Sequence, residues 1–317
     1  MPSLANTYGI AARNFTSYPE LPDMKALVEY GETIEALGYD SLWVWDHMLL
    51  GVDPNFPIMD SLTVLTAVAA RTKRIRLGTG ILVLPLRNAV LLAKQLSTMD
   101  RLSNGRMLMG MASGWYKREF DCCGVPFDKR GKIMDENLDM LTRLWTEPKV
   151  DGEYSRNKLS AAVMYPKPVQ QDGIPILIGG YVDRVLQRAG KVGGWLTYFY
   201  KPEDFARSWE KIRNFAQEAG RDPDTLMNAS QLPIMVGPSR EAVQEKMLEW
   251  LNAEWDFPAQ SDCSRESAVM GTVDECVEQL KAHHKVGVQK IIFVPYKYEM
   301  GQVETIAREI IPRLKQA

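Results

Sequence analysis

Short apolar runs alternate with amphipathic stretches along most of the chain, which predicts β-strands alternating with α-helices. The runs are rich in Val, Ile, Leu and Met and have the length of buried strands. The stretches between them repeat their apolar residues at helical spacing and commonly end at glycine. Strands are predicted for residues 8–13, 41–45, 75–82, 106–112, 174–178, 195–198, 227–236 and 290–294.

Helices are predicted wherever the apolar spacing is close to 3.6 residues. The clearest start is Thr272-Val273-Asp274-Glu275, a capping box in which the threonine hydroxyl and the glutamate carboxylate each bond a free amide. The other main helices are predicted for residues 23–37, 62–71, 88–102, 131–146, 202–219, 240–251 and 303–314. Alternating strands and helices without a break in composition favour an α/β fold, a single (β/α)8 TIM barrel over residues 1–317.

Two segments interrupt the alternation, residues 147–173 and 252–270, and we interpret them as insertions. Long irregular segments in compact domains are usually functional, and the first one carries several apolar side chains among its prolines and charges. We therefore expect its middle to cover the mouth of the barrel and to become ordered when a cofactor binds. The alternative is a doubly wound sheet with a second domain, for which residues 147–173 are the only candidate linker.

Composition excludes several classes of protein. The chain has 317 residues, of which 45% are hydrophobic and 25% charged, and its net charge of −2 gives no field suited to nucleic acid or a membrane surface. The sequence has no apolar run long enough to span a membrane and no apolar secretory core at its start, so we expect a cytoplasmic protein.

The four cysteines, at positions 122, 123, 263 and 276, have no C-x-x-C spacing, which indicates a reducing compartment. We expect the adjacent Cys122 and Cys123 to be small buried apolar residues, with a redox-active pair as the alternative.

Candidate chemistry begins at Asp46 and His47, which follow the second predicted strand. A histidine beside a carboxylate can exchange a proton near neutral pH, with a histidine packed beneath a loop as the alternative. The other histidines, His283 and His284, fall in the last turn of a predicted helix, where a cation suits the helix dipole, so we interpret them as structural. The sequence contains no metal-ligand spacing, no G-x-S-x-G and no G-x-G-x-x-G.

Small residues follow two further strands. Ser113-Gly114-Trp115 follows the strand at 106–112, and Gly179-Gly180 lies between a strand and a helix, where free amides suit an anion such as phosphate. Paired glycines are often only turns, but in parallel α/β proteins ligands bind at the carboxyl ends of strands. Together with Asp46 and His47, these positions predict a planar redox cofactor that carries a phosphate.

Several segments resemble the luciferase-like flavin and deazaflavin oxidoreductases: LWVWDHML, RIRLGTGILVLP, MDRLSNGRMLMGMASGWYKREFDCCGVPFDKRG, LTRLWTE, PKPVQ and ILIGG. The resemblance implies a (β/α)8 barrel and a non-proline cis peptide at Gly80-Ile81 in a bulge of the third strand. It also places Asp46 and His47 at the cofactor ring as catalytic residues, with Asp46 also contacting the cofactor. Finally, it implies that Gly80, Ile81 and Ser113 contact the cofactor and that Gly179 and Gly180 bind its phosphate.

The resemblance leaves two cofactors open. Bacterial luciferases place an FMN-phosphate arginine at the position of Ser113, and serine there is more similar to the subgroup that uses the deazaflavin F420. The near-equal use of Lys (18) and Arg (20) is untypical of the GC-rich actinobacteria in which F420 is concentrated. We therefore favour a monooxygenase that uses reduced FMN and O2 on a small organic substrate, with F420-dependent hydride transfer as the alternative.

Two non-redox readings are also open. A flavin-holding protein without turnover would need no proton-transfer group, so Asp46-His47 counts against it. A phosphate-binding aldolase barrel would place a lysine at the carboxyl end of a strand, whereas Lys290 begins its strand. The resemblance further implies a homodimer, formed through a partly exposed apolar face within residues 62–70, and a separate reductase that supplies reduced flavin.

Overall fold

The computed structural model describes residues 4–52, 55–255 and 266–316. The fold is a (β/α)8 barrel, as the alternation predicts. Neighbouring strands pair in parallel, and β9 pairs with both β8 and β11, which closes the sheet. Its strands are β1 (Thr7–Ala11), β2 (Ser41–Val44), β3 (Arg76–Val83), β4 (Met107–Ala112), β7 (Ile176–Gly179), β8 (Gly194–Tyr198), β9 (Met227–Val236) and β11 (Lys290–Pro295).

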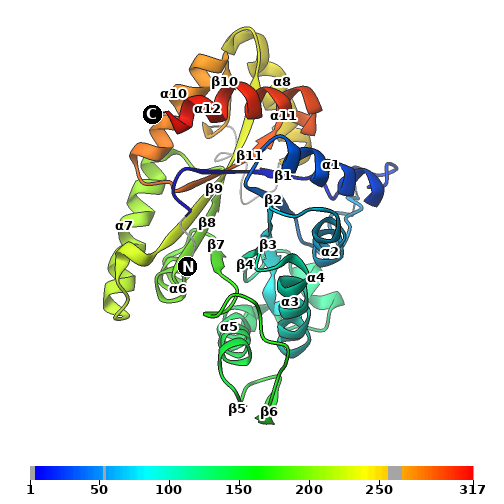
Figure 1. Cartoon of the computed structure of the whole chain (residues 1–317), viewed down its shortest axis with the longest axis vertical. Helices are drawn as coiled ribbons and strands as arrows, with labels where there is room; N and C mark the ends of the chain where they lie inside the picture. The colour runs from blue at the N-terminus through cyan, green and yellow to red at the C-terminus, as the bar shows by residue number, and fades with distance from the viewer. Residues whose placement is uncertain (1–3, 53–54, 256–265, 317) are drawn as a thin grey trace. The chain divides into compact units, whose positions relative to one another are not determined.

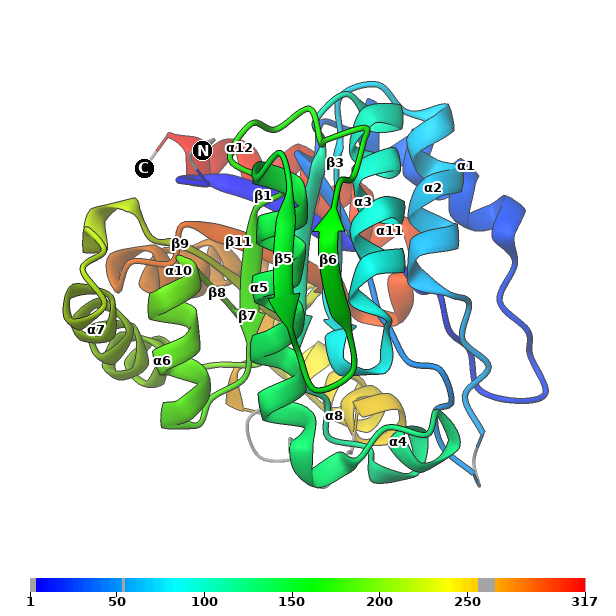
Figure 2. The ribbon, with the colours of Figure 1, turned by 90° about the horizontal axis from the view of Figure 1, so that it is seen from below.

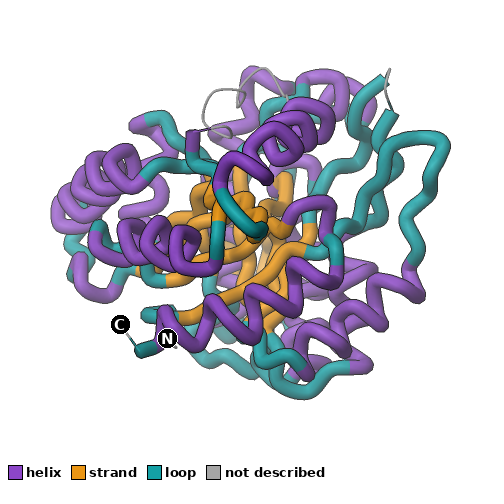
Figure 3. The backbone as a smooth tube through the Cα atoms, turned by 90° about the horizontal axis from the view of Figure 1, so that it is seen from above, coloured by secondary structure: helices purple, strands orange, loops and turns teal. Residues whose placement is uncertain are grey.

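The helices cover the outer faces of these strands (Figure 3). The capping box at Thr272 is confirmed, since its side chain and that of Glu275 make both reciprocal bonds. The longer helices are α1 (Met24–Ala36), α2 (Ser61–Arg71), α3 (Ala89–Ser103), α5 (Arg130–Thr146), α6 (Asp183–Val192), α7 (Pro202–Glu218), α8 (Arg240–Trp255) and α10 (Val273–Lys285). The last helical segment joins α11 (Met300–Thr305) to α12 (Ile311–Lys315) through a π-helical turn.

The chain divides into two compact units (Figure 1). Among the described residues, the first unit comprises Arg13–Glu29 and Val44–Ile176, and it contains β3, β4, α2, α3 and α5. The second comprises Pro2–Ala12, Tyr30–Trp43 and Leu177–Ala317, and contains β1, β8, β9, β11 and the helices from α6 onward. The single-domain organisation expected for residues 1–317 stays a prediction.

Residues 147–173 are irregular only in part, and their interpretation as an insertion stays a prediction. They contain an antiparallel hairpin of β5 (Val150–Glu153) and β6 (Lys158–Ala162), which lies beside α5 (Figure 2). At its turn the Tyr154 hydroxyl donates to Asp139 (2.5 Å) and the Ser155 amide donates to Glu136 (3.1 Å). These contacts hold the turn of the hairpin on α5, and the coverage of the barrel mouth by this segment and its ordering on cofactor binding stay predictions.

The chain after this hairpin runs along α3. Lys94 donates to the Tyr165 carbonyl, Arg101 donates to the Lys167 carbonyl (2.8 Å), and the Val169 amide donates to Asp100 (2.8 Å). These contacts hold residues 165–169 against α3.

The second insertion, residues 252–270, is only partly described. Helix α8 extends into it as far as Trp255, residues 256–265 lie outside the described part, and β10 (Val269–Gly271) pairs with the end of β9.

Three other expectations need correction or completion. Cys122 and Cys123 are exposed, not buried, because they end a short surface helix; Cys276 is buried and Cys263 lies outside the described residues. The apolar residues of α2 are mostly buried within the protomer, which removes the sequence basis for a dimer face there. Among the described residues, no helix has the length and apolarity of a membrane span.

The two histidines of α10 are structural, but the electrostatic reason expected from the sequence is wrong. His283 is 3% exposed, and burial, followed by the neighbouring His284, lowers its pKa to about 4 from 6.5. His283 is therefore neutral at pH 7 and supplies no cation to the helix end. Burial also lowers the pKa of His284, whose Nδ1 donates to the Val288 carbonyl (2.9 Å) while its Nε2 is 3.2 Å from the Tyr8 hydroxyl.

We expect His283 to make the protein acid-sensitive. Its folded-state pKa is depressed, so the stability it confers is present above pH 6.5 and is lost as the pH falls toward 4. The loss is at most about 3 kcal/mol. Urea unfolding at pH 7 and pH 4.5 should show a smaller pH-dependent decrease for His283→Leu than for the unchanged protein. An equal decrease in both proteins would contradict this assignment.

Candidate active site

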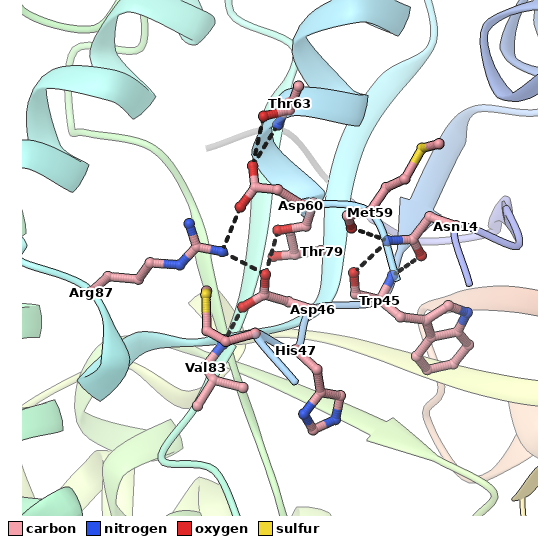
Figure 4. Close-up of polar contacts among 12 residues, drawn as sticks. Asn14, Trp45, Asp46, His47, Met59, Asp60, Thr63, Thr79, Val83 and Arg87 are labelled. Carbon is pink, nitrogen blue, oxygen red and sulfur yellow. Dashed lines mark hydrogen bonds and ion pairs between the residues drawn. The ribbon is translucent and has the colours of Figure 1, made fainter. Parts of the chain in front are cut away.

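The carboxylate of Asp46 ties together three segments of the first unit (Figure 4). Asp46 is 3% exposed and follows β2 by two residues. Its Oδ1 accepts hydrogen bonds from the Ser61 hydroxyl (2.7 Å) and from Arg87 Nη2 (2.7 Å), and its Oδ2 accepts one from the Val83 amide (2.9 Å). The carboxylate therefore fixes the end of β3 against the start of α2.

Arg87 extends this network to a second carboxylate. Its Nη2 also donates to Asp60 (2.9 Å), the N-cap of α2, which accepts from the Thr63 amide (2.9 Å). Partial burial would raise the pKa of Asp60, but the bonds from Thr63 and the charge of Arg87 outweigh it and lower that pKa. The buried Nε of Arg87 has no hydrogen-bond partner in the described part of the chain.

Asn14 fixes the backbone just before Asp46. Its Nδ2 donates to the carbonyls of Trp45 and Met59 (2.9 Å each), and its Oδ1 accepts from the Trp45 amide (2.9 Å). The side chain is fully buried, so this set of bonds is shielded from water. The direction in which the chain leaves Trp45 is thus set by a residue far earlier in the sequence.

His47 points away from the Asp46 network, as Figure 4 shows, and bonds a different carboxylate. Its Nδ1 is 3.1 Å from Oε2 of Glu119, which lies on α4 (Lys117–Cys122) and is 1% exposed. The other oxygen of Glu119 accepts from the backbone amides of Met48 and Leu49. Because a carboxylate only accepts, Nδ1 donates this hydrogen bond, and Nε2 is the ring nitrogen that Glu119 does not contact.

A partly exposed aromatic side chain, Trp115, lies beside His47. The indole of Trp115 is 37% exposed and meets the imidazole edge-on, with ring centroids 5.9 Å apart. Before it, Gly114 has φ +78° and a Cβ there would lie 2.7 Å from Val83, so only glycine fits. Ser113, half-exposed, follows β4 directly, and Arg130 donates to the Gly114 carbonyl (3.2 Å).

The bulge in β3 is present, and the cis peptide at Gly80-Ile81 is confirmed. The register of β3 against β4 shifts by one residue between Thr79 and Leu82, so Ile81 leaves the regular ladder. Ile81 packs against a core cluster that includes Phe120, the residue after Glu119. The bulge, His47 and Trp115 are thereby linked through Val83 and α4.

Gly179 and Gly180 belong to the second unit, where they join β7 to α6. Gly180 has φ +126°, and the N-cap residue of α6, Val182, makes no side-chain capping bond. That the backbone amides of this turn hold an anion stays a prediction. The structure thus groups Asp46, His47, Gly80, Ile81 and Ser113 within one unit and places the glycine pair in the other.

Sequence reasoning missed Glu119, Arg87 and Asn14. Glu119 stands among Lys117, Arg118 and Asp121, a pattern that looks like a solvated surface. Its position within the block 99–131 that carries the family resemblance was the one available signal. Trp195 on β8 is fully buried core. In the described residues, no group of three or more His, Cys, Asp or Glu side chains is arranged to hold a metal.

A family model for luciferase-like monooxygenases matches residues 7–290. The chain belongs to the luciferase-like family. One relative is the F420-dependent glucose-6-phosphate dehydrogenase of Amycolatopsis mediterranei, 27% identical over 91% of this chain and 94% of its own length. A second is 4-hydroxyprotoasukamycin monooxygenase of Streptomyces nodosus subsp. asukaensis, 28% identical over 80% of this chain and 75% of its own length.

One solved structure has a similar fold. The monooxygenase RslO1 of Streptomyces bottropensis superposes with a TM-score of 0.82 at 19% identity, covering 97% of this chain and 99% of its own. At that identity the likeness supports the barrel fold alone. The two named relatives are thus one F420-dependent dehydrogenase and one monooxygenase.

Proposed function

We propose that this luciferase-like protein is an oxidoreductase that uses reduced FMN and O2 to oxygenate a small organic substrate. The observation that carries the proposal is the His47–Glu119 pair, whose Nδ1 is held at 3.1 Å from a buried carboxylate while Nε2 has no hydrogen-bond partner among the described residues. A histidine oriented in this way is suited to hold or move one proton at Nε2. The relative named a monooxygenase supports the reaction class.

The residues present fit a flavin-type ring. Ile81 in the β3 bulge and the exposed indole of Trp115 beside His47 provide apolar surface, and Ser113 provides a hydroxyl at the end of β4. The amides around Gly179 and Gly180 would hold the phosphate. When bound, the cofactor would supply the redox chemistry, and the protein would orient it and exclude water.

Asp46 has a positioning role in this proposal. Its three hydrogen bonds engage it with Ser61, Val83 and Arg87, so it is placed to fix the bulge and the start of the loop that bears His47. We assign the proton transfer to His47, with Glu119 as the group that orients it.

F420-dependent hydride transfer is the second candidate. Ser113 favours it, since bacterial luciferases place the FMN-phosphate arginine at this position, and so does the F420-dependent relative that covers nearly the whole chain. A flavin-binding protein without turnover is the candidate of another class. Such a protein needs no proton-transfer group, so the hydrogen-bonded pair of His47 and the buried Glu119 counts against this candidate.

Binding of each cofactor decides between FMN and F420, and turnover with a substrate separates an enzyme from a protein that only holds the flavin. We expect titration with FMN and with F420, each in oxidised and reduced form and followed by quenching of the protein's tryptophan fluorescence, to show saturable binding of one of the two. Preference for FMN supports the monooxygenase, and preference for F420 supports hydride transfer. If neither binds at high micromolar concentration, the proposed function is wrong.

The remaining partners are proposals of the same kind. We propose a homodimer in the cytoplasm, with a separate reductase that supplies reduced FMN. Three apolar side chains are each more than 60% exposed: Leu91 on α3, and Val163 and Tyr165 in the segment that follows β6. They support an association surface there rather than on α2.

A further inference from the structure

The tyrosine after the glycine pair is bonded to the neighbouring strand. Strand β7 pairs with β8 only through Ile178–Trp195 and Gly179–Leu196, whereas β8 continues to Tyr198. The amide of Tyr198 donates to the Tyr181 hydroxyl (3.2 Å), and that hydroxyl donates to the Tyr198 carbonyl. The Tyr181 hydroxyl thus makes the two hydrogen bonds to Tyr198 that a further residue of β7 could have made.

A second bond holds the same turn from the other side. The indole Nε1 of Trp195 donates to the Gly180 carbonyl (2.9 Å). Trp195 is fully buried and its ring packs against Phe205 and Trp209, with centroids 5.1 and 6.4 Å away, so its donor is fixed in place. Gly180 is therefore held at φ +126° between two bonds to β8.

We propose that Tyr181 is a positioning residue for the phosphate-bearing end of the cofactor. Its hydroxyl serves the strand and not the ligand, but it sets where the amides of Gly180 and of the first turn of α6 point. The acidic residue in that turn, Asp183, forms an ion pair with Lys211 (2.8 Å), and this pairing weakens its electrostatic repulsion of an anion. This inference rests on the proposed function, because it takes the glycine turn as the phosphate site.

The test compares ligands with and without phosphate. Tyr181→Phe keeps the ring, which stacks on Tyr200 with centroids 4.6 Å apart, and removes only the hydroxyl. Tyr200→Phe is the matched control, because its hydroxyl lies 3.3 Å from Ser208 and makes no bond to the turn. Dissociation constants are measured for two pairs of ligands. The first pair is FMN and riboflavin, and the second is F420 and its ribityl deazaflavin core without the phosphodiester. Thermal unfolding checks that each variant is folded.

We expect Tyr181→Phe to weaken binding of the phosphate-bearing ligand by about threefold to tenfold, the effect of one net hydrogen bond. Binding of the phosphate-free ligand should stay unchanged, and Tyr200→Phe should change neither. If the unchanged protein prefers the phosphate-bearing ligand and Tyr181→Phe keeps that preference in full, or weakens both ligands equally, the role of Tyr181 is wrong while the proposed function stands. If the unchanged protein binds both ligands of a pair equally, the phosphate site and the role of Tyr181 are wrong together.

Discussion

Replacing His47 with alanine is expected to lower kcat by about 10²- to 10⁴-fold, the usual contribution of a general acid or base. The Kd for the cofactor should change little, because the ring contacts assigned to Ile81 and Trp115 remain. The physical reason is the loss of Nε2, which the bond from Nδ1 to Glu119 holds in one orientation. Steady-state kinetics with a substrate that supports turnover, together with cofactor titration, measure the two effects separately.

Two controls make this expectation specific. Added imidazole should restore part of the activity of His47→Ala, since the missing group is a proton carrier and the site retains its shape. Glu119→Gln should lower kcat by less, because the histidine is still present but is less firmly oriented. An unchanged kcat for His47→Ala would assign His47 to structure, and a parallel loss of cofactor affinity would make it a binding residue.

Replacing Asp46 with alanine is expected to lower the free energy of unfolding by about 3–5 kcal/mol, as for one partner of a buried ion pair. The substitution leaves the Val83 amide and the Ser61 hydroxyl without their acceptor, and Arg87 with only Asp60. Because the Arg87 side chain is 15% exposed, its guanidinium cannot recover full hydration. Urea unfolding followed by tryptophan fluorescence measures the loss.

The matched comparison is Asp60→Asn, which removes the other carboxylate bound to Arg87. Asp60 is 41% exposed, so its loss should cost distinctly less than that of Asp46. If Asp46→Ala unfolds like the unchanged protein yet loses as much turnover as His47→Ala, Asp46 is a proton-transfer residue, as the sequence alone suggests, and not a positioning residue.

The barrel could be predicted because its signals are local. Strand β9 has the bounds that the apolar run 227–236 predicts, and the capping box at Thr272 needs only four consecutive residues. The hairpin in 147–173 could not be found in this way. Its strands bury few side chains, among them Val150 and Leu159, so neither shows the alternation that marks a half-buried strand.

The candidate site was only partly predictable, because its chemistry depends on partners that are distant in sequence. Asp46 and His47 are adjacent and read as one pair, yet they bind separate partners, Arg87 and Glu119, 41 and 72 positions away. Helix α4 has six residues, too few for an apolar period, so the burial of Glu119 was hidden. Adjacency in sequence therefore pointed to both residues as one catalytic pair and suggested for Asp46 a role that its contacts do not favour.

A crystal structure with the bound cofactor, FMN or F420, tests the central claim most directly. We expect the ring to lie against the Gly80-Ile81 bulge and Trp115, with His47 Nε2 facing it and Nδ1 still on Glu119. The phosphate should contact the backbone amides that follow Gly179. A ring bound away from the bulge, or a His47 that leaves Glu119 and makes no contact with the ligand, would contradict the account.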